Sequence, residues 1–272
     1  RILPELHLAC ARYYQQRAQS DANNRSQWLR EAVYHQLQGD PATADALWLR
    51  LLHDADAESA VALAEEAVRQ PLFFDAPAQD ADAARFGAAV RARAHFELAR
   101  WIVQASETPS PDDWADVQRR LAAMDALSVA AEEIATAGEL AYLRGRLLWA
   151  QGQPEPALAL CQQALQHPAN DRNELELRLL CGQLLRLLDQ SGAAEQFSRA
   201  AVLDHQQQLG RQGEIMPGWI AALEVEERHQ EAAQASRAWR DALAGSDEVE
   251  QIGESLLAHL RQYLAMGQEQ AA

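Results

Sequence analysis

The segment Gly138–Asp171 constrains the fold of this chain more than any other stretch, because it contains two helical patterns in succession. The small residue Gly145 lies inside the first pattern, and Gly152 ends it. In the second pattern Ala157 and Ala164 recur seven residues apart. Small residues at such positions let two neighbouring helices pack closely, and units of about 34 residues are typical of helical repeats. The segment therefore predicts a helix–turn–helix hairpin.

Three further segments repeat this pattern of large and small residues. The matching residues are Trp28, Ala32, Gly39, Ala44 and Trp48 in the first, Gly182, Ala194 and Ala201 in the second, and Trp219, Ala235, Trp239 and Ala242 in the third. Trp28 and Trp48 are 20 residues apart, and Trp219 and Trp239 have the same separation. We expect Trp28 to be a core residue, so that Trp28→Ala costs about 3–5 kcal/mol.

The pattern resembles that of tetratricopeptide repeats over roughly Arg25–Val249, with a gap in register between Glu58 and Ala137. The resemblance implies an all-α fold, a right-handed superhelix of stacked antiparallel helical hairpins. The composition agrees, because Ala and Leu are abundant whereas Val, Ile and Thr are sparse. We expect one domain over 1–272, made of a leading helix (1–24), first repeats (25–79), irregular long helices (80–137) and the clearest repeats (138–272), which end in an open stacking face.

Outside the clearest hairpin, helices are expected at Leu3–Gln19, Arg25–Gln38, Glu58–Gln70, Ala81–Glu107, Leu127–Ala137 and Glu248–Met266. Gly39 is expected to adopt the left-handed conformation after a helix, and Ser110 with Pro111 to begin another helix. The expected buried residues of the long helix Ala81–Glu107 are Phe86, Val90, Phe96, Leu98, Trp101 and Ile102. In the irregular loop Pro71–Asp80, the residues expected to cap the neighbouring core are Leu72, Phe73 and Phe74, the alternative being an exposed hydrophobic hook.

The formal net charge of −16 argues against a nucleic-acid partner, because such binding depends largely on cations that neutralise phosphates. A membrane partner is disfavoured for the same reason, and no apolar run approaches the roughly 18 residues of a spanning helix. All 24 basic residues are Arg, and the absence of Lys excludes a Gly-Lys-Ser/Thr phosphate loop and Schiff-base chemistry. The three cysteines fit no disulfide framework, so we expect a cytoplasmic protein.

No catalytic or metal-binding constellation emerges from the sequence. The eight histidines include no pair at the i, i+4 spacing of a helical zinc site, and the acidic clusters fall at predicted helix starts or on solvated faces. Cys161 and Cys181 are expected to meet as core thiols of neighbouring repeats. No Ser/His/Asp arrangement or nucleophile elbow can be assembled. We therefore predict that the chain is not an enzyme and binds no cofactor.

A narrower resemblance lies near the start of the chain, in HLACARYYQQR and the later WLREAVYHQLQGDPATADALW. The residues that carry it are His7, Tyr13, Tyr14, Glu31, Tyr34, His35, Leu37 and Gly39. These segments resemble the junction in bacterial signal-transducing ATPases with numerous domains, where a nucleotide-binding module and a winged helix lead into a helical sensor arm. The resemblance implies an ATPase upstream, which this arm holds off until it is engaged. Because the chain begins at Arg1 and not at Met, we expect a piece of a longer protein.

In tetratricopeptide repeats, ligands usually contact a concave groove lined by the first helix of each hairpin. The corresponding positions here are Glu139, Tyr142, Arg146, Trp149 and Ala150, followed by Glu176, Leu179, Gln183, Arg186 and Leu187. The candidate partner-binding residues among them are Tyr142, Arg146, Trp149, Gln183 and Arg186. Arginines can pair with a partner carboxylate, and flat aromatic rings are common anchors at interfaces. The alternative is that Trp149 fills the groove floor and the arginines pair with neighbouring acids.

The expected function is that of a non-catalytic module that binds a protein or peptide in this groove. It would act as the sensor or regulatory arm of a multidomain signalling ATPase. Two alternatives stay open at this point. The chain could be a free-standing adaptor that bridges proteins, or a helical accessory domain of an enzyme whose active site lies elsewhere.

Overall fold

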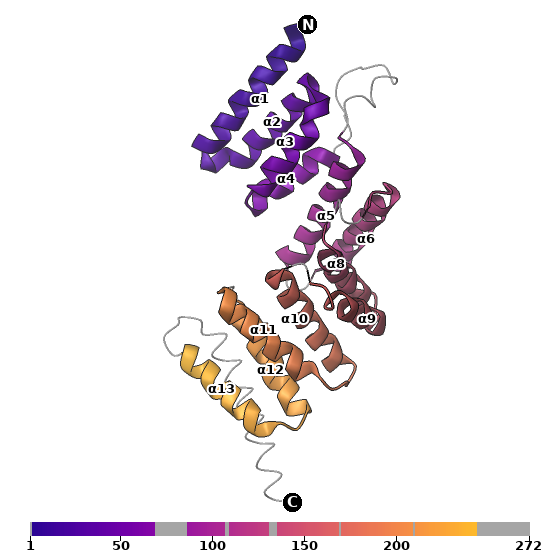
Figure 1. Ribbon diagram of the computed structural model, residues 1–272, viewed down its shortest axis with the longest axis vertical. Coiled ribbons are helices and arrows are strands. Elements are labelled where there is room, and N and C mark those ends of the chain that lie inside the picture. The colour runs from indigo at the N-terminus through magenta and orange to yellow at the C-terminus, as the bar shows by residue number, and fades with distance from the viewer. Residues whose placement is uncertain are drawn as a thin grey trace, which may run out of the picture. The chain divides into compact units, whose positions relative to one another are not determined.

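α-Helices form almost all of the part of the chain that the computed structural model describes, which comprises residues 2–68, 86–106, 109–130, 135–168, 170–208 and 210–243. Over these residues there are twelve α-helices, one short 3-10 helix and no strand (Figure 1). Most of the α-helices pack on a helix that is next to them in the sequence. In addition, α2 (Arg25–Gly39) packs on α4 (Ala57–Val68), and α8 (Ala137–Ala150) packs on α10 (Asp171–Leu187). Such sequential packing is compatible with a helical repeat, as the pattern of small residues predicted. None of the described helices is long and apolar enough to cross a membrane.

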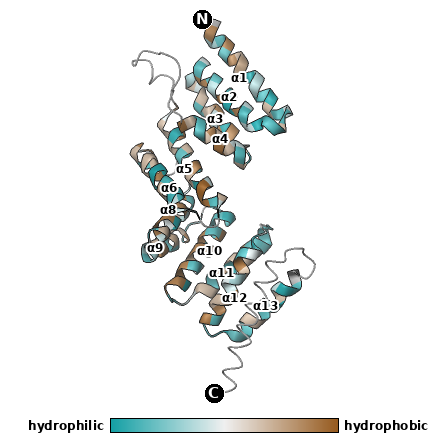
Figure 2. Cartoon of the chain, turned by 180° about the vertical axis from the view of Figure 1, so that it is seen from behind, coloured by the Kyte–Doolittle hydropathy of each residue, from teal (hydrophilic) through white to brown (hydrophobic). Residues whose placement is uncertain are grey.

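The chain divides into two compact units, Arg1–Ala135 and Thr136–Ala272. The helices of the first unit are α1 (Ile2–Ser20), the 3-10 helix η1 (Ala22–Asn24), α2 (Arg25–Gly39), α3 (Pro41–His53), α4 (Ala57–Val68), α5 (Ala88–Ala105) and α6 (Pro111–Ala126). Helix α1 packs on α2, α2 on α3 and α4, α4 on α5, and α5 on α6. Hydrophobic and hydrophilic residues are interspersed along these helices (Figure 2), as expected where one side of a helix is buried.

Trp48 lies at the centre of the first unit's core and is fully buried. Its indole Nε1 donates a hydrogen bond to the carbonyl of Leu63 at 2.8 Å, so α3 and α4 are joined by a polar contact inside an apolar cluster. Trp28 is only partly buried and packs at the edge of this cluster. The expectation that Trp28 is a core residue is therefore confirmed only in part, and Trp48 occupies the deeper position.

Gly39 is the last residue of α2 and does not have the left-handed conformation that the sequence suggested. A close approach of α1 explains why glycine is needed here. A Cβ atom at Gly39 would lie 2.8 Å from Cγ of Leu8 and 3.0 Å from the carbonyl oxygen of Pro4. The glycine therefore serves helix packing instead of helix termination.

The long helix expected at Ala81–Glu107 is observed in part as α5, because the described residues 86, 87 and 106 are not helical. Its buried face also agrees only in part. Phe86, just before the helix, is buried, as are Val90, Phe96 and Leu98. Trp101 is 45% exposed, which corrects the expectation that it is buried. The loop Pro71–Asp80 with Leu72, Phe73 and Phe74, the start of that long helix and the helix Glu248–Met266 lie outside the described residues.

The start of α6 is observed where the sequence predicted it, at Ser110 and Pro111. The Ser110 hydroxyl accepts a hydrogen bond from the backbone N–H of Asp113 at 3.2 Å, and the Asp113 carboxylate accepts from the Ser110 N–H at 2.8 Å. This reciprocal capping box, with Pro111 in the first turn, fixes the helix start. The helix predicted at Leu127–Ala137 is wrong over its described part, because residues 127–130, 135 and 136 are not helical. Ser128 instead has a positive φ of 53°, which ends the helical path after α6.

The second unit contains α8 (Ala137–Ala150), α9 (Pro154–Ala164), α10 (Asp171–Leu187), α11 (Ala193–Gln207), α12 (Gln212–Val225) and α13 (His229–Leu243). Successive helices again pack together, and α10 also contacts α8 and α12. Gly152 has a φ of +73° and lies in the turn between α8 and α9, as predicted. A Cβ at Gly145 would lie 2.7 Å from Sγ of Cys161, so this small residue permits close packing of α8 on α9.

Cys161 and Cys181 are both fully buried in the core of the second unit, as the repeat pattern predicted. A hydrogen bond with Cys181 raises the pKa of the Cys161 thiol, and burial raises this pKa further. Cys161 is therefore a protonated thiol at neutral pH, whereas a reactive cysteine requires the thiolate. Cys161 therefore acts as a packing residue of the core.

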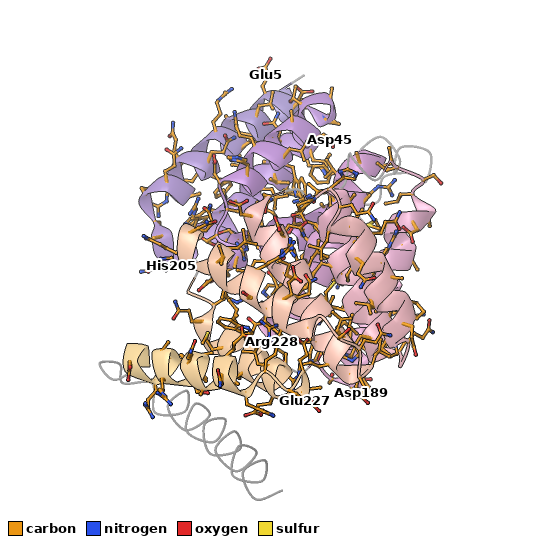
Figure 3. The ribbon with its side chains drawn as sticks, turned by 60° about the horizontal axis from the view of Figure 1, so that its bottom comes forward. Glu5, Asp45, Asp189, His205, Glu227 and Arg228 are labelled. Atoms are coloured by element: carbon orange, nitrogen blue, oxygen red, sulfur yellow. The ribbon has the colours of Figure 1, made fainter. Side chains whose placement is uncertain are left out.

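Glu226 connects two turns of the second unit. Its Oε1 accepts hydrogen bonds from the backbone N–H groups of Gly192 and Ala194, at 3.0 and 3.1 Å. These groups belong to the start of α11, where a carboxylate also interacts favourably with the helix dipole. Figure 3 shows Asp189 and Glu227, from the turns before α11 and before α13, at the same end of this unit. Glu226 thus joins the turn before α13 to the start of α11.

Candidate ligand-binding site

A shallow depression in the second unit is lined by polar side chains from three segments. The lining residues are Tyr142 and Arg146 of α8, Glu176, Leu179, Leu180 and Gln183 of α10, and Arg211 and Glu214 at the start of α12. Helix α10 contacts both α8 and α12, which brings the three segments together. The depression therefore depends on the packing of consecutive helical pairs.

Tyr142 and Arg146 lie one helical turn apart on α8 and contact each other. The Arg146 Nη1 donates a hydrogen bond to the Tyr142 hydroxyl at 3.0 Å, and the guanidinium carbon lies 5.9 Å from the ring centroid. Burial raises the pKa of Tyr142, and the carboxylates of Glu176 and Glu214 raise it further, although Arg146 opposes them. Tyr142 is consequently neutral at physiological pH and can offer its hydroxyl as a hydrogen-bond donor.

Arg211 is held at the opposite side of the lining by both its backbone and its side chain. Its N–H donates to Oδ1 of the buried Asp204 at 2.7 Å, and its Nε donates to Oε2 of Glu214 at 2.7 Å. Burial alone would lower the pKa of Arg211, but Glu214, Tyr142 and Glu176 more than offset this and raise the pKa. Arg211 is therefore a fixed positive charge in the depression.

The lining combines two guanidinium groups, two carboxylates, a phenol and an amide. Glu176 also lies 3.7 Å from the Arg172 guanidinium, so the charges of the site form part of a wider ionic network. Such an arrangement offers both donors and acceptors on a rigid helical surface. It can therefore both donate and accept hydrogen bonds.

Three of the five candidate residues line the depression, namely Tyr142, Arg146 and Gln183. Trp149 and Arg186 are not among the lining residues. Trp149 is partly buried and packs on the core cluster of the second unit, which agrees with the alternative that it fills space under the groove.

The remaining groove positions differ in role. Glu176 and Leu179 line the depression. Glu139 caps α8, because its Oε2 accepts from the N–H of Thr136 at 3.0 Å. Ala150 and Leu187 are exposed. The groove positions given by the resemblance therefore include some of the lining residues on α8 and α10. Others have a different role, as Glu139 does in capping α8.

Sequence reasoning missed Arg211 and Glu214. Both precede Met216, at which the aligned pattern of the last repeat begins, so no repeat position indicated them. A weak signal was available, since the two residues have the i, i+3 spacing of an ion pair at a helix start.

Among the described residues, no three His, Cys, Asp or Glu side chains are grouped so that they could hold a metal ion. Comparison with known proteins adds no relative: no protein-family model, curated protein or solved structure matches the chain. The candidate site therefore rests on its own geometry.

Proposed function

We propose that this chain is a non-catalytic helical-repeat module that binds a segment of another protein in the depression of its second unit. The observation that carries this proposal is the convergence of Tyr142, Arg146, Gln183 and Arg211 on one surface. Arg146 is held against a neutral phenol, and Arg211 against a carboxylate. Preorganised arginines bind partner carboxylates with charge-assisted hydrogen bonds at a small entropic cost.

The proposal includes a finer architecture and a setting. In it the neighbouring helices are antiparallel hairpins of a right-handed superhelix, as in the tetratricopeptide repeats that the sequence resembles. The chain is the sensor or regulatory arm of a larger signalling ATPase. Support for this role comes from the segments around His7 and His35, which resemble the junction that joins such ATPases to their helical arms. A reducing compartment such as the cytoplasm is consistent with the free thiols Cys10, Cys161 and Cys181.

Arg146→Ala is expected to weaken binding of the natural partner about 10- to 100-fold, because a charge-assisted hydrogen bond contributes about 1.5–3 kcal/mol. The tagged chain would be used to capture partners from lysate of the source cell. Captured proteins would be quantified by mass spectrometry and the affinity of the leading partner measured with purified protein.

Arg199→Ala is the matched control, because Arg199 lies in the same unit and its ion pair with Glu195 is exposed. This variant is expected to retain the partner. Both variants must show the helicity of the wild type by far-ultraviolet circular dichroism. A partner that binds Arg146→Ala and wild type equally well would contradict the proposed site.

A further inference from the structure

His7 of α1 and His35 of α2 contact each other through the Nδ1 atom of each ring. The two Nδ1 atoms are 2.8 Å apart, although the residues are separated by 28 positions in the chain. In a hydrogen bond of this kind one imidazole donates its N–H and the other accepts with a lone pair. A ring protonated on both nitrogens has no lone pair. The contact therefore accommodates at most one positive charge on the pair.

Aromatic side chains surround this contact. Tyr14 stacks on His35 with ring centroids 5.5 Å apart and an interplanar angle of 9°, and on its far side it stacks on Trp28 at 5.7 Å. Tyr34 packs edge-on against both His7 and His35. Neither the stacked rings nor Tyr34 supplies a countercharge for a second proton. Two imidazolium rings with centroids 5.0 Å apart would repel each other here.

Helix α1 is attached to the first unit mainly through α2. Its packing partners are α2 and the short η1. Over its described side chains the fully buried residues are the small Ala11 and Ala18, while Leu3 and Leu6 stay exposed. Burial of apolar area contributes roughly 25 cal/mol per Å², so alanines contribute little. The His7–His35 contact and the aromatic stack therefore hold α1 on α2 together with the close packing of Leu8 on Gly39.

We propose that His7 and His35 form a proton-operated latch, which holds α1 on α2 at neutral pH and releases it in a mildly acidic environment. Release uncovers the aromatic face of α2 that carries Trp28 and Tyr34. The hydrogen bond between Trp48 and Leu63 in the deeper core does not involve α1, which contributes only Ala18 to the buried residues of that cluster.

The direction of the pH dependence follows from proton linkage. Burial lowers the pKa of His35 below its ordinary value of 6.5, the charge of His7 lowers it further, and Glu31 acts in the opposite direction. When α1 is released, the two rings are separated and His35 regains the ordinary histidine pKa. The released form therefore binds more protons than the docked form, so docking is fully stable above about pH 6.5 and weakens as the pH falls through the histidine range.

Other charged groups nearby do not titrate in this window. Glu31 is the carboxylate that acts on His35, and Arg17 of α1 lies over the Trp28 ring at 5.6 Å. Two arginines of α2 form ion pairs with acids in or next to α4. Arg25 pairs with Asp56, just before α4, and Arg30 pairs with Glu66 within it. Carboxylates as a class titrate well below this range and guanidinium groups well above it. A transition between pH 7.5 and 5.5 thus reports on the histidines.

Hydrogen exchange measured by mass spectrometry at pH 7.5 and 5.5 tests the latch on the full chain, with labelling times scaled to the intrinsic exchange rate. If the released pair binds two protons and the docked pair one, protection of the α1 amides falls roughly sixfold between these pH values. Peptides from α10 serve as the internal reference and should keep their protection. Unchanged protection of α1 across this range would overturn the proposal.

The variants His7→Gln and His35→Gln remove one ring each, so that a single remaining histidine can be protonated without repulsion. His35→Gln is expected to abolish the pH dependence of α1 protection, and His7→Gln is expected to reduce it, because His35 stays buried in that variant. Both variants should retain their helicity at pH 7.5. Two independent single variants keep the test decisive if one of them folds poorly. A variant that lost protection to the same extent as the wild type would show that other groups cause the change, and would also overturn the proposal.

Discussion

Trp48→Ala is expected to lower the free energy of unfolding of the first unit by about 3–5 kcal/mol, the usual cost of truncating a large buried aromatic residue. The indole is fully buried and fills the space between α3 and α4. Truncation also leaves the carbonyl of Leu63 without the hydrogen bond that Trp48 donates. Because two compact units need not unfold together, hydrogen exchange of peptides from α2, α3 and α4 is the appropriate measurement.

Trp28→Ala is the matched comparison, since the same substitution is made at a partly buried site. Its ring contributes one stacked contact with Tyr14 and a hydrogen bond from its Nε1 to Asp21 at 3.1 Å. We expect a loss of about 1–2 kcal/mol, as for partial apolar burial and one aromatic pair. Equal losses in the two variants would contradict the packing described for this unit.

Phe197→Ala is expected to destabilise the second unit by about 3–5 kcal/mol. The ring is buried between two glycines, Gly182 of α10 and Gly218 of α12. A Cβ at Gly182 would lie 2.8 Å from the ring, and one at Gly218 would lie 2.6 Å from it. Phe197 thus joins three consecutive helices, and its removal leaves a cavity lined partly by backbone. Urea unfolding followed by exchange of α10 and α12 peptides measures the loss.

The close contact between Gly218 and the Phe197 ring also predicts the effect of replacing this glycine by alanine. Gly→Ala inside a helix ordinarily stabilises the helix by roughly 1 kcal/mol. Gly218→Ala should instead destabilise by about 1–3 kcal/mol, because the new methyl group overlaps the Phe197 ring. In a Phe197→Ala background the same substitution should cost less, with a coupling of about 0.5–3 kcal/mol. Additive effects would show that the ring does not lie against Gly218.

Much of this fold was predictable because it depends on local chemistry. Ser110 and Pro111 specify the start of α6, and Gly152 specifies a turn, whatever the rest of the chain does. The repeat pattern also placed small residues correctly where helices meet, as at Gly145. It did not distinguish Trp48 from Trp28, because burial depends on how many neighbours surround a position and not on the residue type.

The functional features were less predictable because they are made by tertiary contacts. Arg211 enters the candidate site from the segment before α12, outside the aligned repeat positions. The contact between His7 and His35 joins two helices and has no spacing signature within either of them. Spacing rules detect pairs on one helix, whereas these pairs arise from the packing of one helix on the next.

The most direct test of the central claim, that the depression binds a protein segment, is site-specific photo-crosslinking in the source cells. A photoreactive amino acid would replace Gln183, which lines the depression, or Gln162, which is exposed on α9 and does not line it. We predict that the probe at position 183 forms a crosslink to one protein, that Arg146→Ala removes this crosslink, and that the probe at position 162 does not form it. The same crosslink from both positions, or from position 162 alone, would contradict the claim.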